Sequence, residues 1–382
     1  IDTNKIVPDG PTISTNFGEK AQNRTYQDLL KNKFDEHNFE QLSTSTIYKV
    51  SIDGSVKKWM DDGMYRTISF SPNGEYVMIS QINKPFSYLV TYSRFPTETN
   101  IYNKDGDFVS NLQKVPLIEE LPKGFMSVRT GKRSFSWRPD KGASLTYVTA
   151  LDSGDPSKKV DFRDEVYELN YPFSGKGKFI LKTINRFSGI DWGTKDMAIA
   201  YDTWWNTRNR KSYVFNPSNP NIKPKIISDR NYQDTYSDPG SFLRSRNEFN
   251  RSVLKMHYGN IFLRGQGFSP SGQFPFIDKV NTKTFEKTRV YQSSYTDKIE
   301  SIIDYDPKKN LLTVSIESPS EYPNYYTKKV KSGKLEKLTN LKNPFLELQN
   351  VKKEKITYLR NDGVELSGCL LYTSPSPRDF VR

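Results

Sequence analysis

Cysteine and histidine are almost absent from this chain of 382 residues, and their scarcity excludes several kinds of site. Cys369 is the single cysteine, so no internal disulfide can form. The two histidines are His37 and His257, and we expect each to be structural or exposed. No Gly-x-Ser-x-Gly segment occurs, so a Ser–His–Asp triad lacks its serine elbow. We therefore predict no catalytic residue, no metal site and no cofactor in the chain as it stands.

Long apolar runs are missing as well. No run approaches the roughly 18 residues of a membrane-spanning helix, so we expect no membrane span. Lysine and arginine exceed aspartate and glutamate by 57 − 44 = 13. The basic residues form no stripe and no nucleic-acid motif is present, so nucleic acid is not an expected partner. The excess indicates either a basic, solvated surface or a positive field that attracts acidic substrates.

Aromatic residues are abundant, with 23 tyrosines and 23 phenylalanines, and this composition favours strands over helices. One hairpin pattern recurs: an apolar strand, a turn of Gly, Asn, Ser or Asp, and a strand that carries lysine. It occurs at 47–59, 100–112, 166–181, 212–227, 276–291 and 325–338. Such spacing, with a period of roughly 40 to 50 residues plus insertions, is typical of four-stranded propeller blades. We predict an all-β fold, a β-propeller of about seven blades, with allowance for an incomplete blade at the N-terminus.

Two stretches depart from the blade pattern. Apolar residues at helical spacing predict a short helical insertion over about 25–41. Near the other end, Lys355–Gly368 has the pattern of a new hairpin that turns at Asn361-Asp362-Gly363. We therefore expect residues 1–350 to form the propeller and 351–368 to begin a second domain.

Eight segments give the chain a resemblance to a known family. In chain order they are RTYQDLLKN (24–32), KPFSYLVTYSRFP (84–96), RSFSWRPD (133–140), DSGDP (152–156), RNYQDTYSDPGS (230–241), RGQGFSPSGQFPFID (264–278), ESPSEYPNYY (317–326) and NDGVELSG (361–368). Together they resemble the propeller of the prolyl oligopeptidase superfamily of serine peptidases, in its glutamyl-endopeptidase branch. The resemblance runs from about Asp9 to Gly368.

The resemblance implies a propeller that caps an α/β-hydrolase domain, which is missing here, so 351–368 is expected to be the start of a truncated hydrolase. It implies that this chain is the non-catalytic, substrate-gating part of a serine-type peptidase that cleaves oligopeptides after Glu. The fragment itself is expected to be inactive, because its peptide substrate would meet the missing domain. The resemblance also implies a bacterial parent that is secreted or periplasmic.

Both ends are expected to be unnatural. The N-terminus, Ile1-Asp2-Thr3, has neither a Met start nor a signal peptide, so we expect it to lie inside a longer reading frame. The string CLLYTSPSPRD, from Cys369 onward, resembles translated sequencing adapter. We therefore expect 369–382 to be a non-native tail.

Arginine is the expected contact for a glutamate side chain, because its planar fork binds carboxylate through two hydrogen bonds. The candidate substrate-binding residues are Arg94, Arg129, Arg133, Arg244 and Arg246. The alternative for each is an ion pair at the surface or between blades.

A stand-alone propeller that binds a protein or glycan partner is the alternative function. Trp204-Trp205 could stack on a sugar, although we expect the pair to pack in a blade core. The hairpin at 355–368 favours the peptidase hypothesis, because a lone propeller has no use for an entry strand to a second domain.

Overall fold

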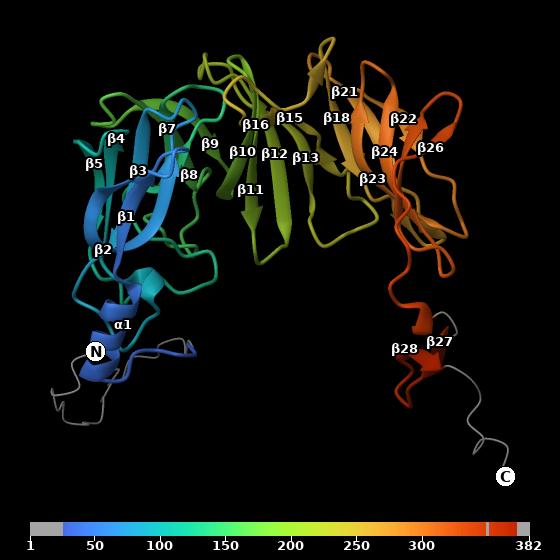
Figure 1. Cartoon of the computed structure of the whole chain (residues 1–382), viewed down its shortest axis with the longest axis horizontal. Coiled ribbons are helices and arrows are strands. Elements are labelled where there is room, and N and C mark those ends of the chain that lie inside the picture. Colours follow the sequence, from blue (N-terminus) through green and yellow to red (C-terminus); the bar gives the residue numbers. More distant parts are fainter. Residues whose placement is uncertain (1–25, 349–350, 373–382) are drawn as a thin grey trace. The chain divides into compact units, whose positions relative to one another are not determined.

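The computed structural model describes residues 26–348 and 351–372 (Figure 1). The chain divides into two compact units, which are described separately. The first unit comprises Ile1–Asp234 together with Arg244–Lys255, and the second comprises Thr235–Leu243 together with Met256–Arg382. Antiparallel sheets dominate both units, and most of these sheets are built from strands that follow one another in the chain.

The first sheet has five strands in the order β1-β2-β3-β4-β5. Their bounds are Ser45–Val50, Val56–Phe70, Tyr76–Ile82, Thr97–Asn103 and Phe108–Val115. The long strand β2 pairs with β1 through its first half and with β3 through Met64–Phe70. The hairpins predicted at 47–59 and 100–112 therefore belong to one sheet, because β2 also pairs with β3 and β3 pairs with β4.

Two further sheets of the first unit are four-stranded meanders. One has the order β6-β7-β8-β9, and the other the order β10-β11-β12-β13. Their bounds are Arg133–Trp137, Ser144–Ala150, Asp164–Asn170, Lys178–Thr183, Arg186–Thr194, Met197–Trp204, Asn209–Phe215 and Lys225–Asn231. Strands β7 and β11 are buried along most of their length, and β11 begins with the apolar run Met197–Tyr201.

Apolar side chains fill the spaces between neighbouring sheets of this unit. One cluster joins Met78, Ile101 and Leu112 of the first sheet to Leu145 and Leu169 of the second. Another joins strands β7 to β9 to strands β10 to β12, and it includes Trp192 and Phe215. These aromatic-rich layers between sheets are the packing expected of propeller blades.

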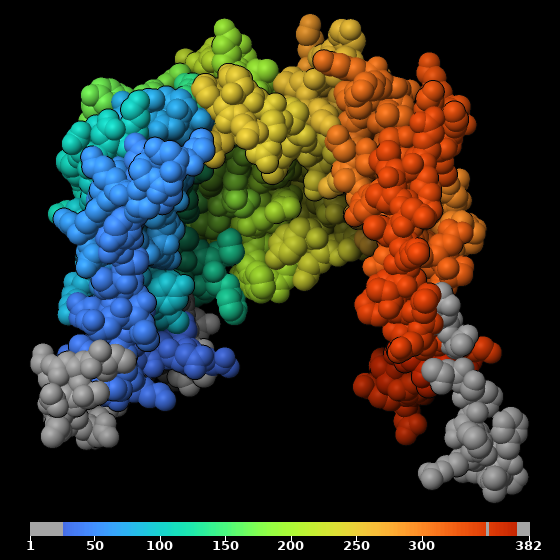
Figure 2. Space-filling model, in the orientation of Figure 1, coloured from blue at the N-terminus to red at the C-terminus, as the bar shows by residue number. Residues whose placement is uncertain are grey.

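A separate hairpin also belongs to the first unit. Its strands are β15 (Arg244–Arg246) and β16 (Ser252–Leu254). Asn247 Nδ2 donates to the Pro139 carbonyl at 2.7 Å, and Arg251 Nη2 donates to the Phe70 carbonyl at 3.1 Å. The hairpin thus contacts the turns after β2 and β6, and its yellow atoms abut the blue β2–β3 region in Figure 2.

The second unit contains two larger sheets. The first has the order β14-β18-β21-β22, with β17 also paired to β18, and the second has the order β23-β24-β25-β26. A small hairpin, β19-β20, accompanies them. The bounds are Ser241–Phe242, Met256–His257, Asn260–Gly265, Phe268–Ser269, Gly272–Gln273, Phe276–Asn281, Lys287–Gln292, Ile299–Asp306, Leu311–Glu317, Asn324–Lys329 and Leu335–Lys337. Ile277, Leu312 and Val314 lie at the centre of the shared core.

The hairpin predicted near the C-terminus is present. Strand β27 (Lys352–Leu359) pairs with β28 (Glu365–Tyr372) around the turn at Asn361-Asp362-Gly363. Strand β28 continues four residues beyond Gly368, where the non-native tail was expected to begin. The expected domain start at 351–368 stays a prediction, and residues 373–382 lie outside the described part.

The predicted helical insertion is shorter than expected. Helix α1 spans Lys33–Ser43, and Asn32 caps it by accepting a hydrogen bond from the Asp35 amide at 2.9 Å. The cap fixes the start, because an asparagine in extended conformation satisfies an amide that the first turn leaves free. Leu30 lies before the helix and packs with Phe39 against the aromatic cluster of Phe86 and Phe95.

Five sheets of four or more strands lie within residues 26–348, where about seven blades were expected. The difference arises partly from the shared strand β2, which makes two predicted hairpins one sheet. The predicted fold class, an all-β propeller with a short helical insertion, is confirmed.

Buried tyrosine hydroxyls predict an alkaline limit to stability. In the second unit, burial and a 2.5 Å hydrogen bond to Glu300 raise the pKa of Tyr291 to about 12. Burial also raises the pKa of Tyr213, whose hydroxyl donates to Asp202. The folded state therefore holds more protons than the unfolded state above about pH 10, the ordinary tyrosine pKa, so its stability is complete below that pH and falls as pH rises through about 12.

Ultraviolet absorbance of tyrosinate, recorded beside circular dichroism during an alkaline titration, checks this expectation. Exposed tyrosines should ionise near about pH 10, and the buried group should ionise together with unfolding. In Tyr291→Phe the titrating hydroxyl is lost, so the alkaline fall in the stability of the second unit should become shallower. Ionisation of all tyrosines before any loss of structure would contradict the prediction.

Candidate functional site

Strand order brings several charged residues to one edge of the first unit. Arg133, Asp164 and Arg186 are the first residues of β6, β8 and β10. Because alternate strands of a meander run the same way, the starts of β6 and β8 lie at the same edge of their sheet. The β7–β8 loop, which contains Asp152, enters at this edge too.

These residues form a buried ion-pair cluster. Arg186 donates two hydrogen bonds of 2.8 Å to the two oxygens of Asp152, and a third of 3.2 Å to Asp164. Arg163 Nη1 donates to Asp152 at 2.7 Å while its guanidinium stacks 4.0 Å above the Trp204 ring. The carboxylates of Asp152 and Asp164 are completely buried. Such pairs hold loops in place, because breaking one leaves an uncompensated buried charge.

The cluster carries more positive than negative charge. Three guanidiniums, those of Arg133, Arg163 and Arg186, face the two carboxylates of Asp152 and Asp164. Arg133 Nη2 lies 2.5 Å from Asp164, but Nε and Nη2 make no hydrogen bond of good geometry to any described residue. The contact is therefore an ion pair in which two donor atoms of Arg133 have no hydrogen-bond acceptor among the described residues.

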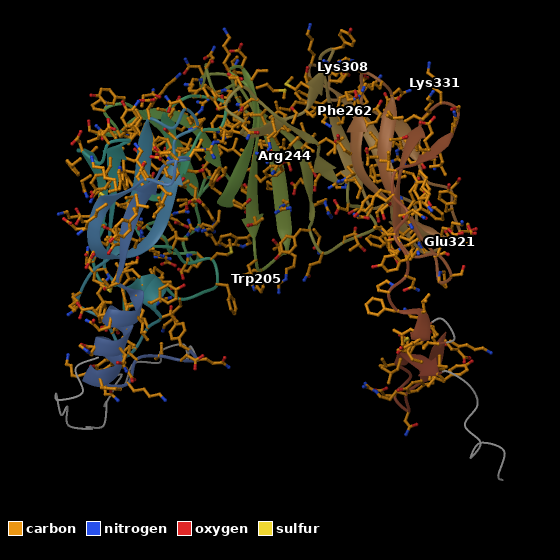
Figure 3. The ribbon with its side chains drawn as sticks, in the orientation of Figure 1. Trp205, Arg244, Phe262, Lys308, Glu321 and Lys331 are labelled. Atoms are coloured by element: carbon orange, nitrogen blue, oxygen red, sulfur yellow. The ribbon has the colours of Figure 1, made fainter. Side chains whose placement is uncertain are left out.

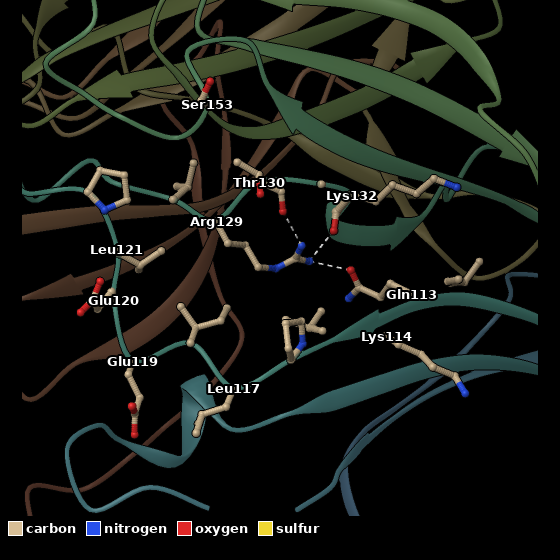
Figure 4. A pocket seen from close by; sticks show the side chains of 17 residues that line it. Gln113, Lys114, Leu117, Glu119, Glu120, Leu121, Arg129, Thr130, Lys132 and Ser153 are labelled. Atoms are coloured by element: carbon tan, nitrogen blue, oxygen red, sulfur yellow. Dashed lines mark hydrogen bonds between the residues drawn. The ribbon is translucent and has the colours of Figure 1, made fainter. Parts of the chain in front are cut away.

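A pocket of about 590 Å³ opens beside this cluster (Figure 4). Its walls are the end of β5 with the segment that follows it, the turn at 128–132, and Ser153. The backbone amide of Val128 donates to the Gly154 carbonyl at 3.1 Å, so the β7–β8 loop supports the turn. The same loop thus holds Asp152 in the cluster and the turn in the pocket wall.

Arg129 extends into this pocket and bonds only neutral groups in the part of the chain described. Its guanidinium donates to the Gln113 amide oxygen at 2.6 Å, to the Thr130 carbonyl at 3.0 Å and to the Lys132 carbonyl (Figure 4). Burial, and in second place the positive charge of Arg133, lower the pKa of Arg129. A half-buried guanidinium beside a second one favours an anion, because a carboxylate would offset the unfavourable burial of charge.

Other charged groups line the pocket. Lys132 Nζ donates to the Gly175 carbonyl at 2.6 Å, and burial lowers its pKa. Lys114 is paired with Glu98 at 3.3 Å. Glu119, an exposed residue, accepts a hydrogen bond from the Ser87 hydroxyl at 2.6 Å, and Glu120 is also exposed. Arg129 and Lys132 are therefore the pocket cations without a carboxylate partner among the described residues.

The structure places the other candidate arginines elsewhere. Arg94 lies in the short helix η1 (Tyr92–Arg94), and its guanidinium lies 5.8 Å from the Tyr26 ring. Arg244 forms an ion pair of 2.5 Å with Asp191, and Arg246 donates to the Asn250 carbonyl within its own hairpin. Arg129 and Arg133 are thus the candidates whose charges interact.

Sequence reasoning missed Asp152 and Arg186 as individual residues. Asp152 starts the segment DSGDP, which was noted only for its resemblance, and nothing in the local sequence marks Arg186. It also missed Lys132 and Gln113. The roles of these residues depend on contacts between segments that lie far apart in the chain. Arg186 and Asp152, for example, are hydrogen-bonded although 34 positions separate them.

The described residues provide neither a metal-binding cluster nor a membrane-spanning helix. No group of three or more His, Cys, Asp or Glu side chains could hold a metal ion there. No helix of the described part is long and apolar enough to cross a membrane. His257 contacts the ring of Tyr258, with ring centroids 4.1 Å apart and planes tilted by 47°.

Comparison with known proteins gives two relatives over nearly the whole chain. A protein of Oryza sativa subsp. japonica named "Probable glutamyl endopeptidase, chloroplastic" is 36% identical over 381 residues, which is 95% of this chain and 41% of the relative. The protein of the same name from Arabidopsis thaliana is 32% identical, with 96% and 40% covered. The chain thus spans about two fifths of the length of these relatives. No family model matches it.

Solved structures with low sequence identity also match. An acylaminoacyl peptidase of Pyrococcus horikoshii is 12% identical with a TM-score of 0.40, over 86% of this chain and 50% of that one. The β-propeller domain of the Trilobed protease of Pyrococcus furiosus is 12% identical with a TM-score of 0.37, over 80% and 77%. With its blade-like sheets, the chain is a propeller portion that is similar, along nearly its whole length, to one part of each of these two relatives.

Proposed function

We propose that this chain is the non-catalytic, substrate-handling part of a serine-type peptidase that acts on oligopeptides and cleaves them after Glu. The observation that carries the proposal is Arg129, a half-buried guanidinium in a pocket of about 590 Å³, which bonds only neutral oxygens among the residues that the structure describes. The printed name of the relatives, glutamyl endopeptidase, supports the same chemistry. The serine elbow would come from another part of the protein, because the sequence contains none.

The pocket would receive an acidic side chain of the peptide. A carboxylate that replaces one of the neutral oxygens at Arg129 would form a charge-assisted, two-pronged hydrogen bond. Lys132 would add positive field from the same wall, and Lys114 less, since Glu98 already partners it. The ion-pair cluster of Asp152 and Arg186 would hold the pocket turn rigid while the peptide enters and leaves.

Binding of labelled peptides, measured by fluorescence anisotropy at low salt, tests the proposal. A short glycine-rich peptide with one central glutamate should bind at least about tenfold more tightly than the same peptide with glutamine, because a charge-assisted bond contributes about 1.5–3 kcal/mol. Arg129→Met should abolish this preference. Arg246→Met, which removes an arginine from the separate hairpin, is the matched control and should retain it.

Equal affinity for the two peptides, or a preference that survives Arg129→Met, would overturn the proposal. The alternative function, a stand-alone propeller that binds a protein or glycan, predicts that glutamate and glutamine peptides behave alike.

A further inference from the structure

Two aromatic side chains stand exposed beside the ion-pair cluster. Phe125 is 75% exposed and Trp205 is 43% exposed, although both are large apolar rings. Their ring centroids lie 5.6 Å apart with planes tilted by 40°. Arg208 places its guanidinium 3.7 Å from the Trp205 ring. This surface, which we call the aromatic step, contradicts the expectation that Trp204-Trp205 packs wholly in a blade core.

The backbone behind the aromatic step is fixed at several points. Arg186 Nε, from the ion-pair cluster, donates to the Met126 carbonyl at 2.9 Å, next to Phe125. On the other side, Arg208 adopts a φ of 54° and its carbonyl accepts a hydrogen bond from the Tyr232 amide at 2.8 Å. Rings presented on anchored turns lose little entropy on binding, which favours their use as contact residues.

A small pocket of about 240 Å³ lies against the step. Its lining residues are Met126, Thr203, Trp205, Arg210 and Tyr232. This volume equals that of about eight water molecules, which is room for one large side chain rather than for a small-molecule cofactor. The pocket offers an apolar wall from Met126 and Trp205 and a positive charge from Arg210.

The step and the Arg129 pocket share one loop. Phe125 and Arg129 are four residues apart in the chain, so their Cα atoms are separated by at most roughly 14 Å. The β11–β12 turn, which carries Trp205, ends at the edge where β10 begins, since Arg186 pairs with Thr203. An extended peptide of about five residues could therefore reach both sites.

We infer that the aromatic step binds the same oligopeptide, and that it receives an aromatic or large aliphatic side chain within about five residues of the acidic one. Charge supports a peptide of this kind, because Arg208 and Arg210 beside the rings would favour an acidic segment. Figure 3 labels Trp205 near the lower end of its sheet, among the loops of the first unit. The inference rests on the proposed function.

Four labelled peptides test it with the whole chain. They combine glutamate or glutamine at one position with phenylalanine or serine three residues away. For the wild-type chain, phenylalanine should tighten binding about fivefold to tenfold over serine, as expected for one added contact between aromatic rings. Phe125→Ala and Trp205→Ala should each remove most of that gain, and Trp205→Phe should keep most of it. Tyr258→Ala, which removes an exposed aromatic of the second unit, should change nothing.

The design separates the two proposals. If glutamate is preferred but phenylalanine gives no gain, or if the gain survives both alanine variants, the inference about the aromatic step is overturned while the proposed function stands. If phenylalanine gives its gain without any preference for glutamate, the proposed function fails and the step remains a binding site. Circular dichroism of each variant confirms that a loss of binding is not a loss of fold.

Discussion

Asp152→Ala is expected to lower the free energy of unfolding of the first unit by about 3–5 kcal/mol. The carboxylate is completely buried and accepts hydrogen bonds from Arg186, Arg163 and the Gly154 amide. Alanine would leave two guanidiniums facing one another without their main counter-charge, in a site that water reaches poorly. Urea unfolding followed by tryptophan fluorescence measures the loss.

A neighbouring carboxylate provides the control. Asp155 belongs to the same DSGDP segment, but its half-buried carboxylate accepts hydrogen bonds from Ser157 alone among the described residues. Asp155→Ala should leave the unfolding midpoint nearly unchanged. Asp152→Asn should fall between the two variants, because it keeps the shape of the side chain and removes its charge. If both alanine variants unfold at the same urea concentration, the cluster does not stabilise the unit.

Gly154→Ala should destabilise the first unit by roughly 2–4 kcal/mol and weaken the glutamate preference of bound peptides. Gly154 has a φ of 77°, which costs an alanine about 1 kcal/mol, and an added Cβ would lie 1.9 Å from the Val128 carbonyl oxygen. The carbonyl must move, and forced movement of this kind costs about 1–3 kcal/mol more. Since Arg129 follows Val128 directly, the pocket should be displaced with it.

Gly175→Ala isolates the conformational part of this effect. Gly175 has a φ of 74°, close to that of Gly154, but within the described part of the chain no neighbouring atom lies within 4 Å of a Cβ added there. This variant should lose only about 1 kcal/mol and should keep the glutamate preference. The unfolding and peptide-binding measurements described above distinguish the two glycines. A loss of stability of the same size in both variants would contradict the steric argument.

Local sequence signals predicted the blades because each sheet is made mostly of consecutive strands. Outside the blades, the turn at Asn361-Asp362-Gly363 was also predicted from local sequence, since its residues alone specify the hairpin that the structure shows. The first sheet was harder to predict. Strand β2 is long enough to pair with β1 and β3 through different halves, and it continues through Asp61-Asp62-Gly63, residues that are typical of a turn. The insertion of Arg244–Lys255 into the first unit also had no local signal.

The sequence predicted the chemistry of the candidate site but not which residues form it. Arginine was expected because of its match to carboxylate, and Arg129 and Arg133 do lie close enough for their charges to interact. Arg244 and Arg246 belong to a different hairpin, where one has an acidic partner and the other a backbone partner. A single sequence cannot distinguish such cases, because the partner that satisfies an arginine is set by tertiary contact.

The hairpin of β15 and β16 has a consequence for the order in which the protein is made. The meander sheets of the first unit can form as soon as their own strands leave the ribosome, since their contacts are local. The bonds of Arg251 to the carbonyls of Phe70 and Ser71 join residues 181 and 180 positions apart. At a synthesis rate of about 5–20 residues per second, roughly 10 to 40 s pass between the synthesis of those two carbonyls and the synthesis of Arg251, their donor. During synthesis the first sheet would therefore present a partly open turn to water and to chaperones, and it would close only when the nascent chain reaches the hairpin.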